Sequence, residues 1–225
     1  MDELFYSGKA ILSIGGLGCN LKCPFYQNHE ISMPHDKRQR DGSAYILTPE
    51  DIVSTAIQYV PQGNIGVAYT YNEPLIGYEY LTNCAKLVHG AGLKNVLVTN
   101  GAINREPLEE LLPLIDAMNI DIKGFTNEFY QKIGGDLETV KQTITLAHSC
   151  CHIEATTLVI PNENEEDIEA IAKWLSSIDP SIPLHLSRFF PRYKYTDKKP
   201  TSRETILRLK EKAEKYLKNV FCGNM

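Results

Sequence analysis

Apolar residues recur along the chain in two alternating patterns, which predict a repeated strand–helix order. Short runs that are nearly continuous in Val, Ile, Leu and Ala are typical of strands buried on both faces. Between them, apolar residues recur every three or four positions, as in helices that pack along one face. The predicted strands are residues 9–15, 65–70, 94–99, 118–122, 152–160 and 183–188, with a last short strand over 219–222. The first predicted helix follows Thr48, and the next two cover 75–90 and 106–115. Residues 126–148 are predicted to be helical with a break at Gly134-Gly135, a further helix runs from Asn162 through Trp174, and the last begins at Thr201.

Two helix starts carry capping signals. Thr48-Pro49-Glu50-Asp51 combines a Thr cap, a proline in the first turn and two acids at the positive end of the helix dipole. Asn162-Glu163-Asn164 is predicted to cap a later helix in the same way. A polar, charged connection is predicted over 34–43, before the first of these helices.

Six strand–helix units in regular alternation predict an α/β fold with parallel strands joined by right-handed crossovers. An open doubly wound sheet and a partial barrel both fit this order. No linker, repeat or low-complexity tract divides the sequence, so residues 1–225 are predicted to form a single domain.

Composition and charge narrow the class of protein. The formal net charge of −5 argues against a general nucleic-acid surface, which depends on Lys and Arg. No apolar run approaches the roughly 20 residues that span a bilayer, so no membrane association is expected. The start Met-Asp-Glu-Leu is acidic where a signal peptide is basic, which predicts a cytoplasmic location. Six cysteines are too sparse for a secreted disulfide framework.

Polar and ionisable residues follow or end every predicted strand. In a parallel barrel the carboxyl ends of the strands meet at one mouth, so these side chains are candidates for a shared site. Each also has a local alternative, such as a turn at Asn100-Gly101 or an ion pair between Asp121 and Lys123. The set comprises Cys19, Cys23 and Tyr26, then Glu73, Asn100, Asp121, Lys123, Glu154 and His185.

The first of these groups lies in the stretch Gly-Cys-Asn-Leu-Lys-Cys-Pro-Phe-Tyr-Gln-Asn. Cys19 and Cys23 are four residues apart, and Tyr26 stands where a third cysteine would complete a Cys-x3-Cys-x2-Cys loop. This loop resembles the cluster-binding loop of radical S-adenosylmethionine (SAM) enzymes, in the branch that contains pyruvate formate-lyase activating enzyme. The resemblance implies a (β/α)6 partial TIM barrel with outer helices. It also implies a 4Fe–4S cluster at Cys19, Cys23 and Tyr26, with SAM bound beside it.

The same resemblance assigns roles to residues at the strand ends. Glu73 matches the acid of the family's Gly-Gly-Glu motif, although Tyr71 and Asn72 replace the glycines. Asp121 and Lys123 match a pair on the fourth strand that contacts the ribose and the carboxylate of SAM. The SAM-binding residues implied are Phe25, Glu73, Asn100, Asp121, Lys123 and His185.

The implied activity is reductive cleavage of SAM to a 5′-deoxyadenosyl radical, which abstracts hydrogen. The implied substrate is a partner protein, as for glycyl radical activases, or another bulky molecule. The implied electron donor is a reduced flavodoxin or ferredoxin. The alternative is a relative without this activity, or with altered chemistry, that binds a cluster or SAM. The cationic and aromatic segment 187–194 is interpreted equally as rim packing or as a substrate or partner contact.

Tyr26 leaves four possibilities open. Its phenolate can ligate iron, another thiol such as Cys222 can replace it, the cluster can bind through two cysteines only, or the site is inactive. A zinc site is a weaker alternative, because only His29 is available in sequence as a further ligand.

Overall fold

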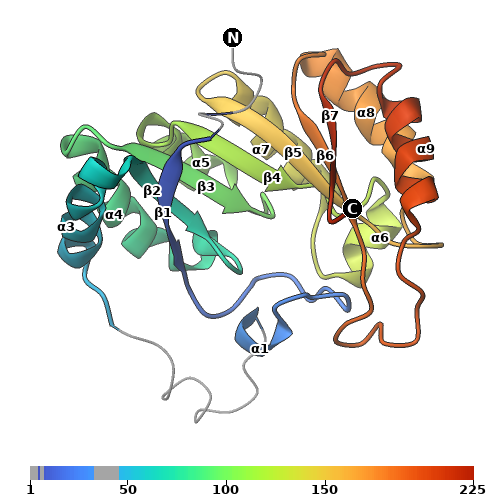
Figure 1. Ribbon diagram of the computed structural model, residues 1–225, viewed down its shortest axis with the longest axis horizontal. Coiled ribbons are helices and arrows are strands. Elements are labelled where there is room, and N and C mark those ends of the chain that lie inside the picture. Colours follow the sequence, from blue (N-terminus) through green and yellow to red (C-terminus); the bar gives the residue numbers. More distant parts are fainter. Residues whose placement is uncertain (1–4, 6–7, 33–45) are drawn as a thin grey trace.

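Seven parallel strands form one sheet in the order of the sequence (Figure 1). The computed structural model describes residue 5, residues 8–32 and residues 46–225. The strands are β1 (Ala10–Gly15), β2 (Asn64–Thr70), β3 (Lys94–Thr99), β4 (Ala117–Asp121), β5 (His152–Val159), β6 (Leu184–Arg188) and β7 (Val220–Gly223). Every neighbouring pair is parallel, which confirms the predicted α/β partial barrel.

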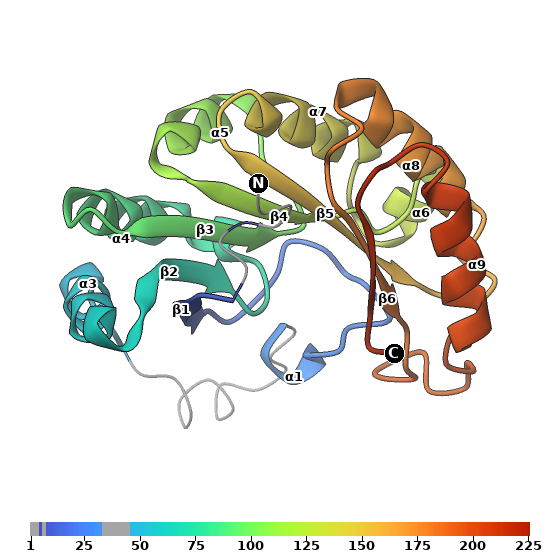
Figure 2. The same ribbon diagram turned by 45° about the horizontal axis from the view of Figure 1, so that its top comes forward.

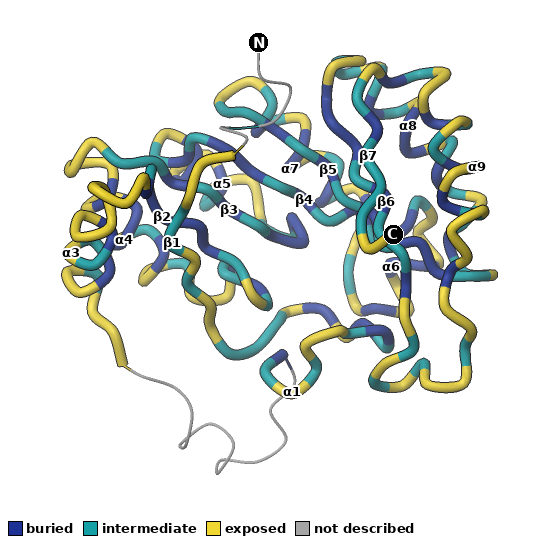
Figure 3. The backbone as a smooth tube through the Cα atoms, viewed as in Figure 1, coloured by how far each residue is buried: buried dark blue, intermediate teal, exposed yellow. Residues whose placement is uncertain are grey.

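Helices cover the outer face of this sheet, which curves as an arch (Figure 2). They are α3 (Pro49–Gln58), α4 (Tyr78–Gly90), α5 (Arg105–Leu111), α6 (Asn127–Lys132), α7 (Leu137–His148), α8 (Asp167–Ile178) and α9 (Arg203–Ala213), with 3-10 turns η1 (Val60–Gln62), η2 (Pro74–Gly77) and η3 (Leu112–Leu114). The short helix α1 (His29–Ser32) lies apart from them, in the loop that follows β1 (Figure 1). The apolar faces of the covering helices are buried toward the strands, while their outer faces are exposed (Figure 3). The inner face of the arch is therefore left to side chains of the strands and to the loops at the strand ends.

One predicted helix start is confirmed and the other is wrong. The Thr48 hydroxyl accepts from the Asp51 amide, and the Asp51 carboxylate accepts from the Thr48 amide, which together form a capping box. Asn162–Asn164 do not cap α8, which begins only at Asp167. Instead the Asn164 side chain accepts from the Ile160 amide and donates to the carbonyls of Lys123 and Leu158. It thereby ties together the loops that follow β4 and β5.

Two further sequence expectations concern the connection over 34–43 and segments that cross a membrane. The polar connection predicted over 34–43 lies outside the described residues. Within the described part of the chain, none of the helices combines the length and the apolar character that crossing a bilayer requires.

Candidate functional site

The loop after β1 brings Cys19, Cys23 and Tyr26 together at the carboxyl ends of the strands. The Tyr26 hydroxyl donates to the Leu21 carbonyl at 2.8 Å, and both thiols lie close enough to act on its pKa. Cys23 is almost fully buried, at 1% exposure, whereas Cys19 and Tyr26 are half-buried. The loop is held because the Lys22 amide donates to the Ile133 carbonyl after α6. Two thiols and one phenol oxygen therefore converge on one place.

The protonation of these groups follows from their burial. Burial raises the pKa of Cys23 to about 11, although the nearby Lys123 ammonium opposes that rise. Burial, together with interactions with Cys19 and Cys23, raises the pKa of Tyr26 far above that of a free phenol. Cys23 and Tyr26 therefore need a bound cation to ionise at neutral pH.

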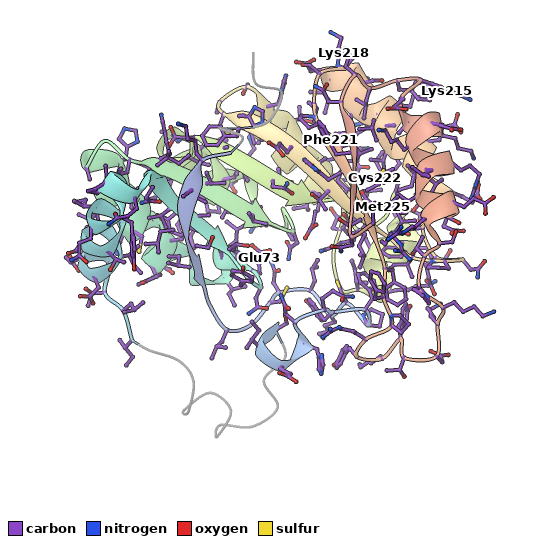
Figure 4. All side chains as sticks on the ribbon, in the orientation of Figure 1. Glu73, Lys215, Lys218, Phe221, Cys222 and Met225 are labelled. Carbon is purple, nitrogen blue, oxygen red and sulfur yellow. The ribbon has the colours of Figure 1, made fainter. Side chains whose placement is uncertain are left out.

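A second layer of polar side chains supports Cys19. The Asn100 amide nitrogen lies 3.6 Å from the Cys19 sulfur and donates to the Asn20 oxygen at 2.8 Å. The Asn100 backbone amide in turn donates to Glu73 at 2.8 Å, and the Thr99 hydroxyl donates to the same carboxylate at 2.6 Å. Glu73 is 3% exposed, and Figure 4 shows it near the end of β2. Its oxygens are used within the protein, so Glu73 holds β2 and β3 together beneath the loop.

The two residues before Glu73 have an unusual backbone. Tyr71 and Asn72 have φ values of 51° and 84°, in the left-handed region that glycine adopts freely. These are the positions where the resemblance places two glycines. Asn72 is fixed there because it accepts from the Ser32 hydroxyl at 2.6 Å and donates to the Gly16 carbonyl at 2.5 Å. The chain thus keeps a glycine-like turn with other residues, and this turn joins β2 to the β1 loop and α1.

Asn72→Ala is expected to destabilise the protein by about 2–3 kcal/mol. The variant loses two hydrogen bonds worth about 1 kcal/mol each and places a less tolerant residue at positive φ. Urea unfolding followed by circular dichroism measures the change. Asn72→Gly loses the same bonds but tolerates the turn, so it should be the more stable variant by about 1 kcal/mol. Equal stability of the two variants would contradict the role given to the backbone conformation.

Asp121 and Lys123 form an ion pair beside the loop. The Lys123 nitrogen lies 2.7 Å from an Asp121 oxygen, and both side chains are largely withdrawn from solvent. Burial alone would lower the pKa of Lys123, but the Asp121 carboxylate outweighs it and raises the pKa, so the ammonium stays charged. The pair lines a cavity of about 290 Å³, the upper cavity, which the β1 loop also lines. Its lining includes Cys23, Tyr26, Asp121, Lys123, Thr156 and Ser187.

Phe25 anchors the loop against the segment that follows β6. Its ring is 4% exposed and packs against the rings of Phe129 and Tyr195, with centroids 6.1 and 6.0 Å away. In the same region the Lys194 amide donates to the Pro24 carbonyl at 3.1 Å. Tyr193 stacks on His29, with ring centroids 5.0 Å apart. The segment 187–194 is thus packed on the loop, while Arg192 and Lys194 remain exposed.

Glu154 and His185 lie deeper in the barrel than the sequence suggests. Both are in the first half of their strands, and neither lines the upper cavity. The His185 Nε2 lies 2.7 Å from one Glu154 oxygen, and the His152 Nε2 lies 3.1 Å from the other. The structure therefore pairs His185 with Glu154 rather than with the loop of Cys19 and Cys23.

The stability that Glu154 provides should depend on pH. Burial alone would raise its pKa, but hydrogen bonds from His152 and His185 lower the pKa to about 2. Because the pKa of Glu154 is lower in the folded protein than in the unfolded chain, the ionised carboxylate stabilises the fold. This contribution is complete above the ordinary glutamate pKa and is lost as the pH falls toward 2. Glu154→Gln should thus cost about 2–3 kcal/mol at pH 6, allowing for partial solvent contact, and progressively less from pH 4.5 downward. Urea unfolding at several pH values measures this, and a difference independent of pH would contradict it.

The remaining ligand candidates lie elsewhere. Phe221 stacks on His185 inside the barrel, so the neighbouring Cys222 on β7 faces the opposite side (Figure 4). Its charged neighbours there are Lys210 and Glu214, which belong to the region of α9. Among residues 5, 8–32 and 46–225, no group of three or more His, Cys, Asp or Glu side chains could hold a metal ion. His29 does not complete a zinc site with the two cysteines.

Two further residues of the upper cavity, Thr156 and Ser187, lie within the strand ends 154–157 and 185–188 that the sequence indicated, but the sequence assigned them no role of their own. Each lies two positions after a residue of the deeper pair, Glu154 or His185, and therefore on the same face of its strand. Counting every second residue from Glu154 and from His185 toward the end of each strand would have identified Thr156 and Ser187.

Comparison with known proteins gives one family. The family model of the radical SAM superfamily matches residues 13–175. An uncharacterized protein of Methanocaldococcus jannaschii is 38% identical over 98% of this chain, which spans 66%, just under two thirds, of that protein. A second protein of that organism, named as a glycyl-radical enzyme activating enzyme, is 29% identical over 98% of this chain and 91% of its own. A domain of pyruvate formate-lyase-activating enzyme from Bacteroides vulgatus has a similar fold, with a TM-score of 0.61 and 20% identity over 71% of this chain and 99% of that one.

Proposed function

The chain belongs to the radical SAM superfamily of enzymes, and from this premise we propose that it cleaves SAM at a 4Fe–4S cluster held by Cys19, Cys23 and Tyr26. The observation that carries the proposal is the convergence of two thiols and the Tyr26 hydroxyl beside the upper cavity. Three protein donors suit a cluster that leaves one iron open for SAM. When bound, the cluster supplies the electron that splits SAM into methionine and a 5′-deoxyadenosyl radical.

The residues present fit this cofactor in number and in chemistry. Tyrosine oxygen is a harder donor than sulfur, but phenolate does bind iron in some proteins. The Asn100 amide holds the Cys19 sulfur in place, and such hydrogen bonds also tune the potential of a cluster. The buried Phe25 excludes water from the back of the loop.

We propose that Asp121 and Lys123 bind SAM in the upper cavity. The Lys123 ammonium suits the SAM carboxylate, and Asp121 suits a ribose hydroxyl or the ammonium group. Asn100 acts through Cys19, and Glu73 acts through the backbone amides of Leu75 and Asn100, from which it accepts hydrogen bonds. His185 lies one step deeper along β6, so a SAM contact there requires the nucleoside to reach into the barrel.

We propose an activase-type substrate, a segment of a partner protein or another bulky molecule. This is supported by the name of the second relative and by the exposed Arg192 and Lys194 beside the loop. A reduced flavodoxin or ferredoxin in the cytoplasm is the proposed electron donor. Such donors are acidic proteins, and the positive charges of Arg192 and Lys194 beside the loop favour their association.

A second candidate is a relative that binds SAM or a cluster with altered chemistry or none. The hydrogen bond from Tyr26 to Leu21 and the raised pKa of Tyr26 favour it, because both stabilise the neutral phenol. This form does not ligate iron until a cation displaces its proton.

Anaerobic reconstitution tests the proposal. The protein is analysed for iron and sulfide, then assayed with dithionite and SAM for 5′-deoxyadenosine. Wild-type protein should bind a cluster and form the product, and Cys19→Ala should do neither. Cys222→Ala is the matched control and should behave as wild type, because its thiol faces the helix layer. A cluster without 5′-deoxyadenosine would favour the second candidate, and wild-type protein that takes up no iron would contradict the first.

A further inference from the structure

The inner face of the barrel is divided into a polar wall and an apolar wall. Strands β4 and β5 present Asn119, His152 and Glu154 on this face, and His185 of β6 contacts Glu154. Strands β1 to β3 present only apolar side chains around the same space, and Lys9 lines it directly before β1. Those apolar side chains include Ile11, Ile65, Ala68, Val96 and Val98. A molecule between the walls would meet hydrogen-bonding groups on one side and, apart from Lys9, hydrocarbon on the other.

This space is a second cavity of about 260 Å³, the lower cavity, one step below the upper cavity. On β5, Glu154 lines the lower cavity and Thr156 lines the upper one. Two residues along a strand span about 7 Å. Between the cavities the Thr156 hydroxyl donates to the Asn119 oxygen at 2.8 Å, which forms a floor between them.

The polar wall of the lower cavity is a fixed cluster centred on Glu154. One of its oxygens lies 3.1 Å from both the His152 Nε2 and the donating Phe5 amide, and the other lies 2.7 Å from the His185 Nε2. Aromatic rings pack on both imidazoles, with Phe221 5.3 Å from His185 and Phe5 5.7 Å from His152. Such clamped side chains are preorganised as a binding site requires.

The chemistry of this cluster selects for hydrogen-bond donors. Glu154 is ionised at neutral pH and accepts only, with one of about four acceptor positions left. Both imidazoles direct Nε2 at this carboxylate. The Asn119 oxygen already accepts from Thr156. The wall therefore offers the Glu154 carboxylate, with its remaining acceptor position, and the Asn119 oxygen, to which a primary ammonium with its N–H donors is complementary.

We propose that the lower cavity binds a small primary amine, with its ammonium group on the Glu154–His152–His185 cluster and its apolar body against β1 to β3. The cavity holds about 260 Å³, and the β1 loop does not extend it as it does the upper cavity, so the ligand is compact. Phe5 already shows this chemistry, because it places an N–H on Glu154 and an apolar ring on His152. That such an amine is a substrate of the radical reaction rests on the function proposed above, but its binding does not.

Calorimetric titration with three matched probes tests the proposal: 2-phenylethylamine, the neutral 2-phenylethanol and the anionic 3-phenylpropionate. The amine should bind the full chain at least tenfold more tightly than the other two. Because none of the cluster residues is a proposed iron donor, the result should be the same before and after reconstitution. A failed iron reconstitution therefore leaves this test intact.

Three variants locate the site. Glu154→Gln should reduce amine affinity at least tenfold, to the level of the alcohol. Val98→Phe fills part of the apolar side while keeping the Glu154 carboxylate, and it should weaken all probes. Glu163→Gln, a part-buried carboxylate bound by Lys198 and Tyr195, is the control and should bind as wild type. The proposal is overturned if the amine binds no more tightly than the alcohol, if the anion binds best, if no probe binds up to about 10 mM, or if folded Glu154→Gln and Val98→Phe proteins retain wild-type affinity.

Discussion

Tyr26→Phe is expected to lose the cluster, with iron content and 5′-deoxyadenosine formation falling together. The variant keeps the ring and removes only the oxygen that lies beside the two thiols. Loss of an outer-shell partner of a metal ligand typically costs roughly 10–100-fold in metal affinity, and loss of a ligand itself should cost more. Iron and sulfide analysis after anaerobic reconstitution measures this, with visible absorption to identify the cluster.

Tyr26→Cys provides the comparison. It supplies a softer donor, so it should retain iron while its absorption spectrum and reduction potential differ from those of wild type. If Tyr26→Phe binds as much iron as wild type, the phenol oxygen is not a ligand. If Tyr26→Cys alone acquires both a cluster and activity, the wild-type site is inactive.

Lys123→Met is expected to reduce SAM affinity at least tenfold, which corresponds to about 1.4 kcal/mol, and to destabilise the fold. The substitution leaves Asp121 without its partner inside the upper cavity. Breaking a buried pair from one side costs about 3–5 kcal/mol, and the partial exposure of Asp121 places this pair at the lower end. Equilibrium dialysis with labelled SAM and urea unfolding measure the two effects.

Lys198→Met is the matched control for that variant. Lys198 pairs with Glu163 at 2.8 Å and is similarly half-buried, but it lies outside the upper cavity. It should lower stability and leave SAM affinity unchanged. If the two variants bind SAM with equal affinity, Lys123 is not part of the SAM site.

The strands were predictable because each is a short segment, either largely apolar or alternating apolar with polar residues, between polar helix starts. The predicted range 94–99 coincides with β3, and the other strands differ by one residue or so at an end. The start of α8 was not predictable in this way, because an asparagine caps a helix or bridges loops with the same amide. Asn164 bridges loops because three backbone partners from two strand ends surround it.

The loop of Cys19, Cys23 and Tyr26 was predictable from local spacing, but the depth of His185 was not. Depth depends on the stagger of neighbouring strands, and Thr156, not Glu154, is the register partner of His185. The sequence contains no signal for this register. The same holds for the His152–Glu154 contact, which needs the strand to be in place before its period-two faces can be assigned.

The segment that follows β6 packs on the loop that follows β1, so two parts of the chain that lie far apart in the sequence are in contact. The Lys194 amide and the Tyr193 ring contact Pro24 and His29. Because the two segments are in contact, ordering one of them also lowers the conformational entropy of the other. Loading iron near the amino terminus would thereby also shape the carboxy-terminal surface that an approaching protein meets, so a partner could distinguish the loaded from the empty enzyme without touching the metal.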